Sequence, residues 1–104
     1  MKRADILYKV KNVLKKNAPN AKAILFGSFA RGENTIDSDL DILILLDKDE
    51  VTREDEIRIK YPLYDIEFDT GQIISPLVLS QTDWENKHRI TPFYENVLKD
   101  GIAL

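Results

Sequence analysis

The feature that most constrains the fold is a run of apolar residues in the middle of the chain. Residues Leu40 to Leu46 read LDILILL, and the part from Ile42 to Leu46 has no polar residue. A short run of Ile and Leu is typical of a strand buried on both faces, and it is far shorter than the roughly 18–20 residues that span a membrane. The sequence therefore predicts a sheet with this strand near its centre and no membrane partner.

Three other segments indicate how this strand is covered and paired. Residues Ala4 to Lys16 place their apolar side chains at helical spacing, which predicts an amphipathic helix. Ala21 to Phe26 and Ile73 to Ser80 are typical of further strands. Pro76 within the second of these favours an edge position or a bulge, because proline cannot donate a hydrogen bond to a neighbouring strand.

The segment after Pro62 allows two interpretations. Leu63 to Asp69, LYDIEFD, alternates like a strand that could form a hairpin with the segment after it. Alternatively, Pro62 occupies the first position of a helix that Gly71 ends, with Thr52 and Asp55 as an earlier possible helix start. We favour the helix, because it would separate successive strands and cover a face of the sheet.

The last third of the chain contains two helix signals. Thr82 has an acidic residue three positions later, which is the spacing of a capping box, and predicts a short helix carrying Trp84 and His88. Thr91 and the proline after it open a final helix that Lys99-Asp100-Gly101 closes. We expect His88, the only histidine, to have a surface or packing role rather than a catalytic one.

These elements predict one α/β (α+β) domain over residues 1–104, with a small mixed sheet flanked by helices. The length fits a single core, and 43% hydrophobic and 32% charged residues indicate an ordinary globular protein. Because the chain has no cysteine, a cytoplasmic protein is the default expectation. The net charge of −3 argues against nucleic acid as the main partner. The basic N-terminal segment is interpreted as a solvated helix face, or else as a basic edge for a nucleotide or an acidic partner.

A Gly-Ser pair follows the first predicted strand. Gly27 allows another backbone or a phosphate to approach closely, because it has no Cβ. Ser28 is a favoured N-cap for a short helix through Arg31, and free N–H groups at a helix start attract phosphate oxygens. Taken alone, most such pairs are only turns.

Two aspartates lie at the beginning of the central strand. On a strand, Asp39 and Asp41 project from one face, roughly 6.5–7 Å apart along the chain. Two like charges repel, and a divalent cation such as Mg²⁺ or Mn²⁺ would remove that repulsion. Alternatively, these residues only end a loop in water. A calcium loop is excluded because Ile42 and Lys48 replace its required Gly and Glu.

Together, Gly27-Ser28, ten intervening residues and Asp39-Leu40-Asp41 resemble the GS-x10-DxD signature of the DNA polymerase beta-like nucleotidyltransferase superfamily. The compact length and the form GSFARG…SDLDI resemble its minimal nucleotidyltransferases, the MNT group often found beside HEPN-domain proteins in prokaryotes. The close resemblance covers residues 24–46. It implies the nucleotidyltransferase fold.

The resemblance also implies an activity and its residues. A nucleoside monophosphate would pass from an NTP, in the first place ATP, to an acceptor hydroxyl. Gly27 and Ser28 would hold the β- and γ-phosphates, Asp39 and Asp41 would ligate Mg²⁺ or Mn²⁺, and Arg31 would reach phosphate, brace the acidic loop or lie exposed. A HEPN-type protein would be the partner, with this chain as the antitoxin of the pair.

Active members of that superfamily usually have a third carboxylate on a neighbouring strand. The candidate strand IISPLVLS contains no acid. If LYDIEFD were a strand, Asp65, Glu67 and Asp69 would line one of its faces and could supply it; in a helix they would face solvent. A catalytically degenerate module that binds nucleotide or acts by contact with a partner is therefore the alternative function. Ser38 is expected to shape the turn before the first aspartate.

Overall fold

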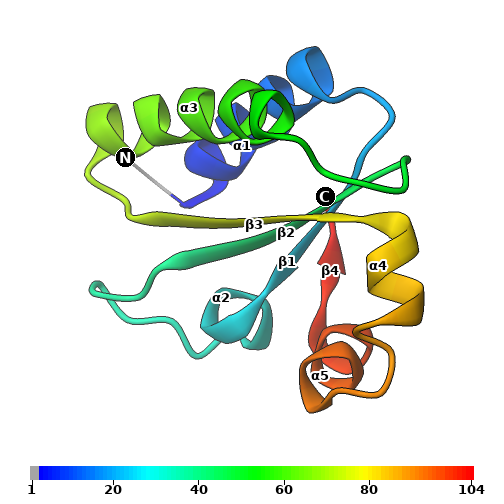
Figure 1. Ribbon diagram of the computed structural model, residues 1–104. Coiled ribbons are helices and arrows are strands. Elements are labelled where there is room, and N and C mark those ends of the chain that lie inside the picture. The colour runs from blue at the N-terminus through cyan, green and yellow to red at the C-terminus, as the bar shows by residue number, and fades with distance from the viewer. Residues whose placement is uncertain (1–2) are drawn as a thin grey trace.

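The computed structural model describes residues 3–104, which form a four-stranded sheet between two layers of helices (Figure 1). The strand order is β3-β2-β1-β4; β2 is parallel to β3, and β1 is antiparallel to both β2 and β4. The strands are β1 (Lys22–Phe26), β2 (Leu40–Leu46), β3 (Ile74–Ser80) and β4 (Ile102–Ala103). The predictions of a mixed sheet, of Leu40–Leu46 in its interior and of Pro76 on an edge strand are confirmed.

The helices cover both faces of the sheet. Two of them, α1 (Arg3–Asn17) and α3 (Arg53–Thr70), lie together on one face (Figure 1). The helices α4 (Gln81–Asn86) and α5 (Pro92–Asp100) pack on the other side. The short helix α2 (Gly27–Arg31) lies next to α5 on that side (Figure 1), although its Phe29 packs in the larger apolar cluster. Within residues 3–104, none of these helices is both long and apolar enough to cross a bilayer.

Alternation along β2 divides the core in two. Its even-numbered residues pack with α1 and α3 in the larger apolar cluster, and Leu43 and Leu45 pack with Trp84 of α4 and Val97 of α5. Asp41 is the one residue of β2 that is not buried. The strand is thus buried on both faces, as predicted, and a single carboxylate interrupts it.

The favoured helix over LYDIEFD is confirmed, but it starts earlier than Pro62. Thr52 and Asp55 form a complete capping box, so α3 begins at Arg53 and Pro62 lies in its interior. A proline there gives up only the one bond to the carbonyl four residues before it, and the rest of the helix is held by packing on the sheet. The expected end is correct, because Gly71 takes a left-handed conformation with φ 77°.

The prediction that Thr82 caps α4 is wrong. Ser80 at the end of β3 is the cap, and its hydroxyl accepts a hydrogen bond from the Asp83 N–H at 3.0 Å. Thr82 instead donates to the Asp49 carboxylate at 2.7 Å. The helix ends at Asn86, so His88 lies beyond it and stacks on Trp84 with ring centroids 6.1 Å apart.

Strand β4 was not predicted. It pairs Ile102 with Leu25 and Ala103 with Ile24, and the Leu104 N–H donates to the Ala23 carbonyl at 2.9 Å. A strand of two residues is too short to show any periodicity, so only pairing with β1 reveals it.

One buried carboxylate anchors the start of α3. The Asp55 side chain is 5% exposed and accepts from Lys48 Nζ at 2.6 Å, from Arg58 at 3.0 Å and from the Thr52 N–H at 3.0 Å. The Lys48 bond, followed by the Thr52 bonds, holds the pKa of Asp55 far below its usual range despite burial. This arrangement ties the loop after β2 to the helix that covers it.

We expect Asp55 to make the fold sensitive to acid. A carboxyl whose pKa is lowered by folding stabilises the protein above its unfolded pKa of about 3.9, and this contribution is lost as the pH falls from there toward the folded pKa. Asp55→Asn should lower the free energy of unfolding at pH 7 by about 2–3 kcal/mol and flatten its fall below pH 4. Urea unfolding across pH measures both effects.

The matched control is Glu56→Gln, because Glu56 pairs with Lys60 at 3.0 Å but is 46% exposed. It should change the unfolding free energy by less than about 0.5 kcal/mol. An Asp55→Asn variant as stable as wild type at pH 7 would contradict the anchoring role.

Candidate active site

The predicted site residues lie at one edge of the sheet, where residues of three neighbouring strands are side by side. Phe26 is paired with Asp41, and Asp41 with Ser75, so the end of β1 and the starts of β2 and β3 meet. Alternation along β2 puts Asp41 on the face of Leu43 and Leu45, which is the side that carries α4 and α5. The site therefore opens on the face opposite α1 and α3 (Figure 1).

The glycine of the predicted turn is in direct contact with the second aspartate. Gly27 has φ 74°, and a Cβ added to it would overlap Asp41 Oδ2 and stand 3.2 Å from Asp41 Cγ. The absence of a side chain is what lets this carboxylate lie against the main chain of the turn. The structure thus joins Gly27 and Asp41, which are separated by a loop in the sequence.

The N-cap role predicted for Ser28 is wrong. Helix α2 begins at Gly27, and Phe26 stands in the cap position without a side-chain hydrogen bond. The left-handed turn at Gly27 starts the helix two residues earlier than the sequence indicates, so Ser28 lies inside it. The Ser28 carbonyl accepts from the Glu33 N–H at 2.9 Å, which closes this short helix.

The two aspartates are close enough to influence each other. Burial in the apolar strand raises the pKa of Asp41, the charge of Asp39 raises it further, and the Arg31 guanidinium acts in the opposite direction. Arg31 extends from the end of α2 with its side chain 42% exposed, and its Nε lies 3.4 Å from Glu33 Oε1. The predicted residues Asp39, Asp41 and Arg31 therefore share one electrostatic environment.

The predicted third carboxylates lie elsewhere. Asp65, Glu67 and Asp69 are on α3, on the other face of the sheet (Figure 1); Asp65 and Asp69 are exposed, and Glu67 accepts from the Ile74 N–H at 2.7 Å. Across residues 3–104, no group of three or more Asp, Glu, His or Cys side chains is arranged to hold a metal ion. The site has two carboxylates.

The residue beside these carboxylates that sequence analysis missed is Ser75. It lies across from Asp41 on β3, and its hydroxyl donates to Asp39 Oδ2 at 3.2 Å. The pattern of β3 could place Ser75 on the sheet but could not reveal its register against β2. Ser38, in contrast, shapes the loop as expected: its Oγ accepts from the Thr35 N–H at 2.8 Å.

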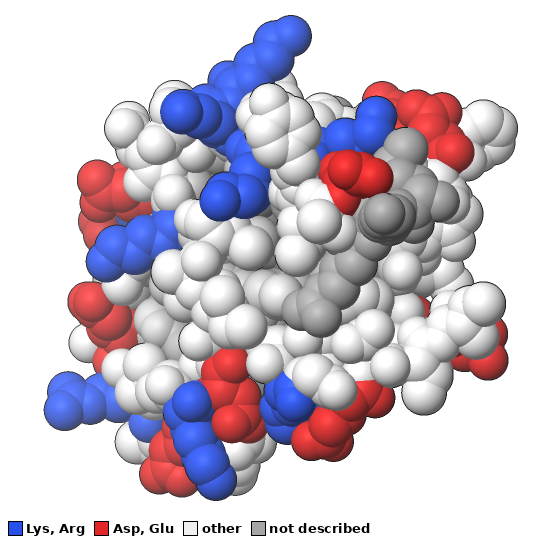
Figure 2. Space-filling model, turned by 180° about the vertical axis from the view of Figure 1, so that it is seen from behind, with Lys and Arg blue, Asp and Glu red and all other residues white. Residues whose placement is uncertain are grey.

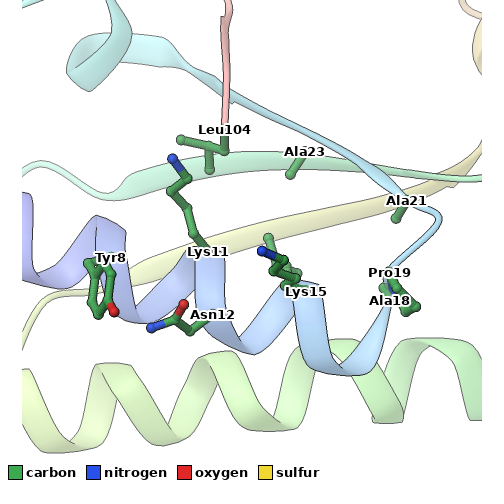
Figure 3. Close-up of a pocket in the computed structure, with 10 residues that line it drawn as sticks. Tyr8, Lys11, Asn12, Lys15, Ala18, Pro19, Ala21, Ala23 and Leu104 are labelled. Carbon is green, nitrogen blue, oxygen red and sulfur yellow. The ribbon is translucent and has the colours of Figure 1, made fainter.

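A separate hollow lies on the opposite side of the molecule. It has a volume of about 380 Å³ and is formed by α1, the start of β1 and the C-terminal residue (Figure 3). Lys11 and Lys15 extend over it, and basic side chains stand out over the upper part of the face seen in Figure 2. The hollow is lined by Tyr8, Lys11, Asn12, Leu14, Lys15, Ala18, Pro19, Ala21, Ala23 and Leu104. None of the predicted site residues is among them.

The fold and the site together define a small α/β protein with paired carboxylates beside a glycine turn. Residues 7–90 match the nucleotidyltransferase domain family, and the chain belongs to that family. It is therefore a nucleotidyltransferase by descent.

Individual relatives agree with this assignment. The chain is 37% identical over 86 residues to a Methanocaldococcus jannaschii protein named "Putative protein adenylyltransferase", covering 80% of this chain and 76% of that one. It is 40% identical over 45 residues to a CCA-adding enzyme of Thermoplasma acidophilum, which is 43% of this chain but only 10% of that enzyme. A crystal structure described as a "putative nucleotidyltransferase from Sulfolobus solfataricus" has the same fold, with a TM-score of 0.53 over 96% of this chain and 82% of that one, at 20% identity.

Proposed function

We propose that the protein transfers a nucleoside monophosphate from an NTP, in the first place ATP, to a hydroxyl of a partner protein. The acceptor oxygen bonds to the α-phosphorus while the bond to the β-phosphate oxygen breaks, so pyrophosphate leaves and the hydroxyl proton passes to water. The observation that carries the proposal is the contact between Asp41 and the main chain of Gly27, with Asp39 beside it.

The residues present fit a divalent cation. Asp39 and Asp41 offer hard carboxylate oxygens, and a cation would offset the burial and the Asp39 charge that raise the pKa of Asp41. These two residues would hold Mg²⁺ or Mn²⁺, and phosphate oxygens of the nucleotide would complete the set. When bound, the cation would neutralise the charge that develops on the departing pyrophosphate.

The turn and α2 supply the nucleotide side of the site. Gly27 lets the triphosphate approach the main chain, Ser28 follows it within α2, and we assign both to the β- and γ-phosphates. Arg31 adds a positive charge that acts on Asp41. The chain's own residues thereby orient the triphosphate across the mouth of the sheet, with its α-phosphorus over the aspartates.

A protein acceptor is supported by the name of the Methanocaldococcus jannaschii relative. The resemblance to the MNT group extends the proposal to a HEPN-type partner, for which this chain would serve as antitoxin by adding AMP. Residues 3–104 are largely used by the sheet and its helices, which leaves little chain for recognising an acceptor. We also propose that the protein is cytoplasmic, as expected from the absence of cysteine.

The test is transfer of label from α-³²P-ATP in the presence of Mg²⁺, with and without the product of the neighbouring gene. Labelled partner protein is the expected result, and the label should disappear in Asp39→Ala and Asp41→Ala. Asp65→Ala and Asp69→Ala are matched controls, because these acids are exposed on the far face, and both should retain full transfer.

A noncatalytic module is the second candidate, and the two-carboxylate site is the observation that favours it. Such a protein would bind ATP and the partner without turnover. Binding of both, with no transferred label and no pyrophosphate released at any Mg²⁺ or Mn²⁺ concentration, would replace the first proposal by this one.

A further inference from the structure

The hydroxyl of Ser75 stands at the edge of the carboxylate pair. Strand β3 runs parallel to β2 in a continuous register from Leu40 and Ile74 onward, which puts Ser75 directly beside Asp41. Its hydroxyl, however, donates to Asp39 Oδ2 at 3.2 Å. Asp39 is two residues before Asp41 and therefore lies on the same face. Ser75 therefore touches one aspartate and neighbours the other.

The side chains next to Ser75 on this face of β3 cannot replace its hydrogen bond, because they are apolar. On the same face of this edge, its apolar neighbours Ile73 and Leu77 are 51% and 37% exposed. Within residues 3–104, the Ser75 hydroxyl is the only hydrogen-bond donor recorded for the exposed Asp39 carboxylate. Without it, the Asp39 carboxylate would lose the one hydrogen bond that fixes its orientation among the described residues.

We propose that Ser75 is a positioning residue, whose hydroxyl holds Asp39 in the orientation in which Asp39 and Asp41 can bind the same divalent cation. Ser75 lies on β3, beside Asp39 and Asp41. Its neutral hydroxyl is on the neighbouring strand, where a third carboxylate was expected. This inference rests on the proposed cation site and adds to it a residue that would act through Asp39, without touching the nucleotide or the acceptor hydroxyl.

A serine hydroxyl in place of a third carboxylate should lower the affinity of the free site for a divalent cation. The free site has two carboxylates instead of three, so we expect it to bind a divalent cation weakly until nucleotide phosphates join. Residues that orient a ligand typically change metal affinity by about 10- to 100-fold when they are removed. Ser75→Asp should have the opposite effect, because it adds a hard oxygen ligand next to the pair.

The experiment is a Mn²⁺ titration followed by electron paramagnetic resonance of the free ion, with and without a nonhydrolysable ATP analogue. Ser75→Ala and Ser75→Val should weaken Mn²⁺ binding by about 10-fold, and Ser75→Thr should stay within about twofold of wild type. Threonine and valine have nearly the same shape, so this pair isolates the hydroxyl from packing. Ser75→Asp should tighten binding in the absence of nucleotide.

Ser38→Ala is the matched control, because its hydroxyl lies in the loop before Asp39 but bonds to Thr35. It should bind Mn²⁺ like wild type. In steady-state transfer assays, Ser75→Val should raise the Mg²⁺ concentration needed for half-maximal rate and recover most of its rate at saturating Mg²⁺, whereas Ser75→Thr needs no such rescue.

Equal Mn²⁺ affinity in wild type, Ser75→Ala and Ser75→Val would overturn the inference, as would equal losses in Ser75→Thr and Ser75→Val. Failure of wild type to bind Mn²⁺ even with the ATP analogue would overturn it too. If the Mn²⁺ series comes out as expected while no variant transfers a nucleotide, the positioning role stands and the proposed transferase function falls.

Discussion

Replacing Asp41 by asparagine is expected to lower nucleotidyl transfer by about 1,000-fold or more while producing a fold that is more stable at neutral pH. The loss follows from the proposed chemistry, because the amide keeps the shape of the side chain but removes the charge that holds the cation. The gain in stability follows from the location of Asp41, the one position of β2 that is not buried and apolar.

The sign of the stability effect comes from the direction of the pKa shift. Burial, together with the charge of Asp39, raises the pKa of Asp41 in the folded protein. The charged form therefore destabilises the fold, and wild type becomes less stable as the pH rises past the unfolded pKa of about 3.9. Asp41→Asn removes this dependence, and we expect a midpoint of thermal unfolding about 2–4 °C higher at pH 7.

Asp37→Asn is the matched control, because Asp37 is an exposed residue of the same loop outside the site. It should leave both the transfer rate and the unfolding midpoint unchanged. Circular dichroism melts at pH 4 and pH 7, combined with the labelled-ATP assay, measure both effects. An Asp41→Asn variant that melts below wild type at pH 7 would mean that the carboxylate is a structural anchor and not a functional charge.

This expected trade of stability for activity distinguishes Asp41 from Asp55, although both are carboxylates within well-packed surroundings. Asp55 is met by two cations and a capping box, so its charge stabilises the fold. Asp41 has the weaker counterpart Arg31 and the repulsion of Asp39. The two carboxylates therefore contribute to the stability of the fold with opposite signs, as the opposite directions of their pKa shifts indicate.

The sequence was sufficient to locate the central strand, and it favoured a helix over LYDIEFD with the correct end but with a start placed too late, at Pro62. Both carry strong local signals: an unbroken apolar run for β2, and the Thr52–Asp55 capping box with Gly71 at the far end for α3. Such features form from residues that are neighbours in the chain, so pattern and structure agree.

The parts that escaped prediction depend on contacts between distant segments. Strand β4 exists because Ile102 meets Leu25, and the bond from Ser75 to Asp39 depends on the register of β3 against β2. The cap of α2 was misplaced because a left-handed glycine leaves no trace in hydrophobic periodicity. The grouping of Gly27 with Asp39 and Asp41 was suggested by spacing and resemblance, and only the fold explains why a glycine has to be there.

Replacing Gly27 by alanine is the second change with a large expected effect. The new Cβ would overlap Asp41 Oδ2 and stand 3.2 Å from Asp41 Cγ, and the residue would be strained at φ 74°. We expect Gly27→Ala to lower the free energy of unfolding by about 3 kcal/mol, combining backbone strain with overpacking. Because Asp41 has to move, transfer should fall by about 100-fold even in the fraction that stays folded.

Gly32→Ala separates strain from overlap, because Gly32 has φ 71° at the other end of α2 but nothing within 4 Å of its added Cβ. That variant should lose about 1 kcal/mol of stability and keep its transfer rate, as urea unfolding and the labelled-ATP assay can show. Equal losses of stability and activity in both variants would mean that backbone strain alone explains Gly27. A loss of transfer confined to Gly27→Ala would instead show that Asp41 requires a glycine at this position, because the two glycines have nearly the same φ and differ in what lies where a side chain would be.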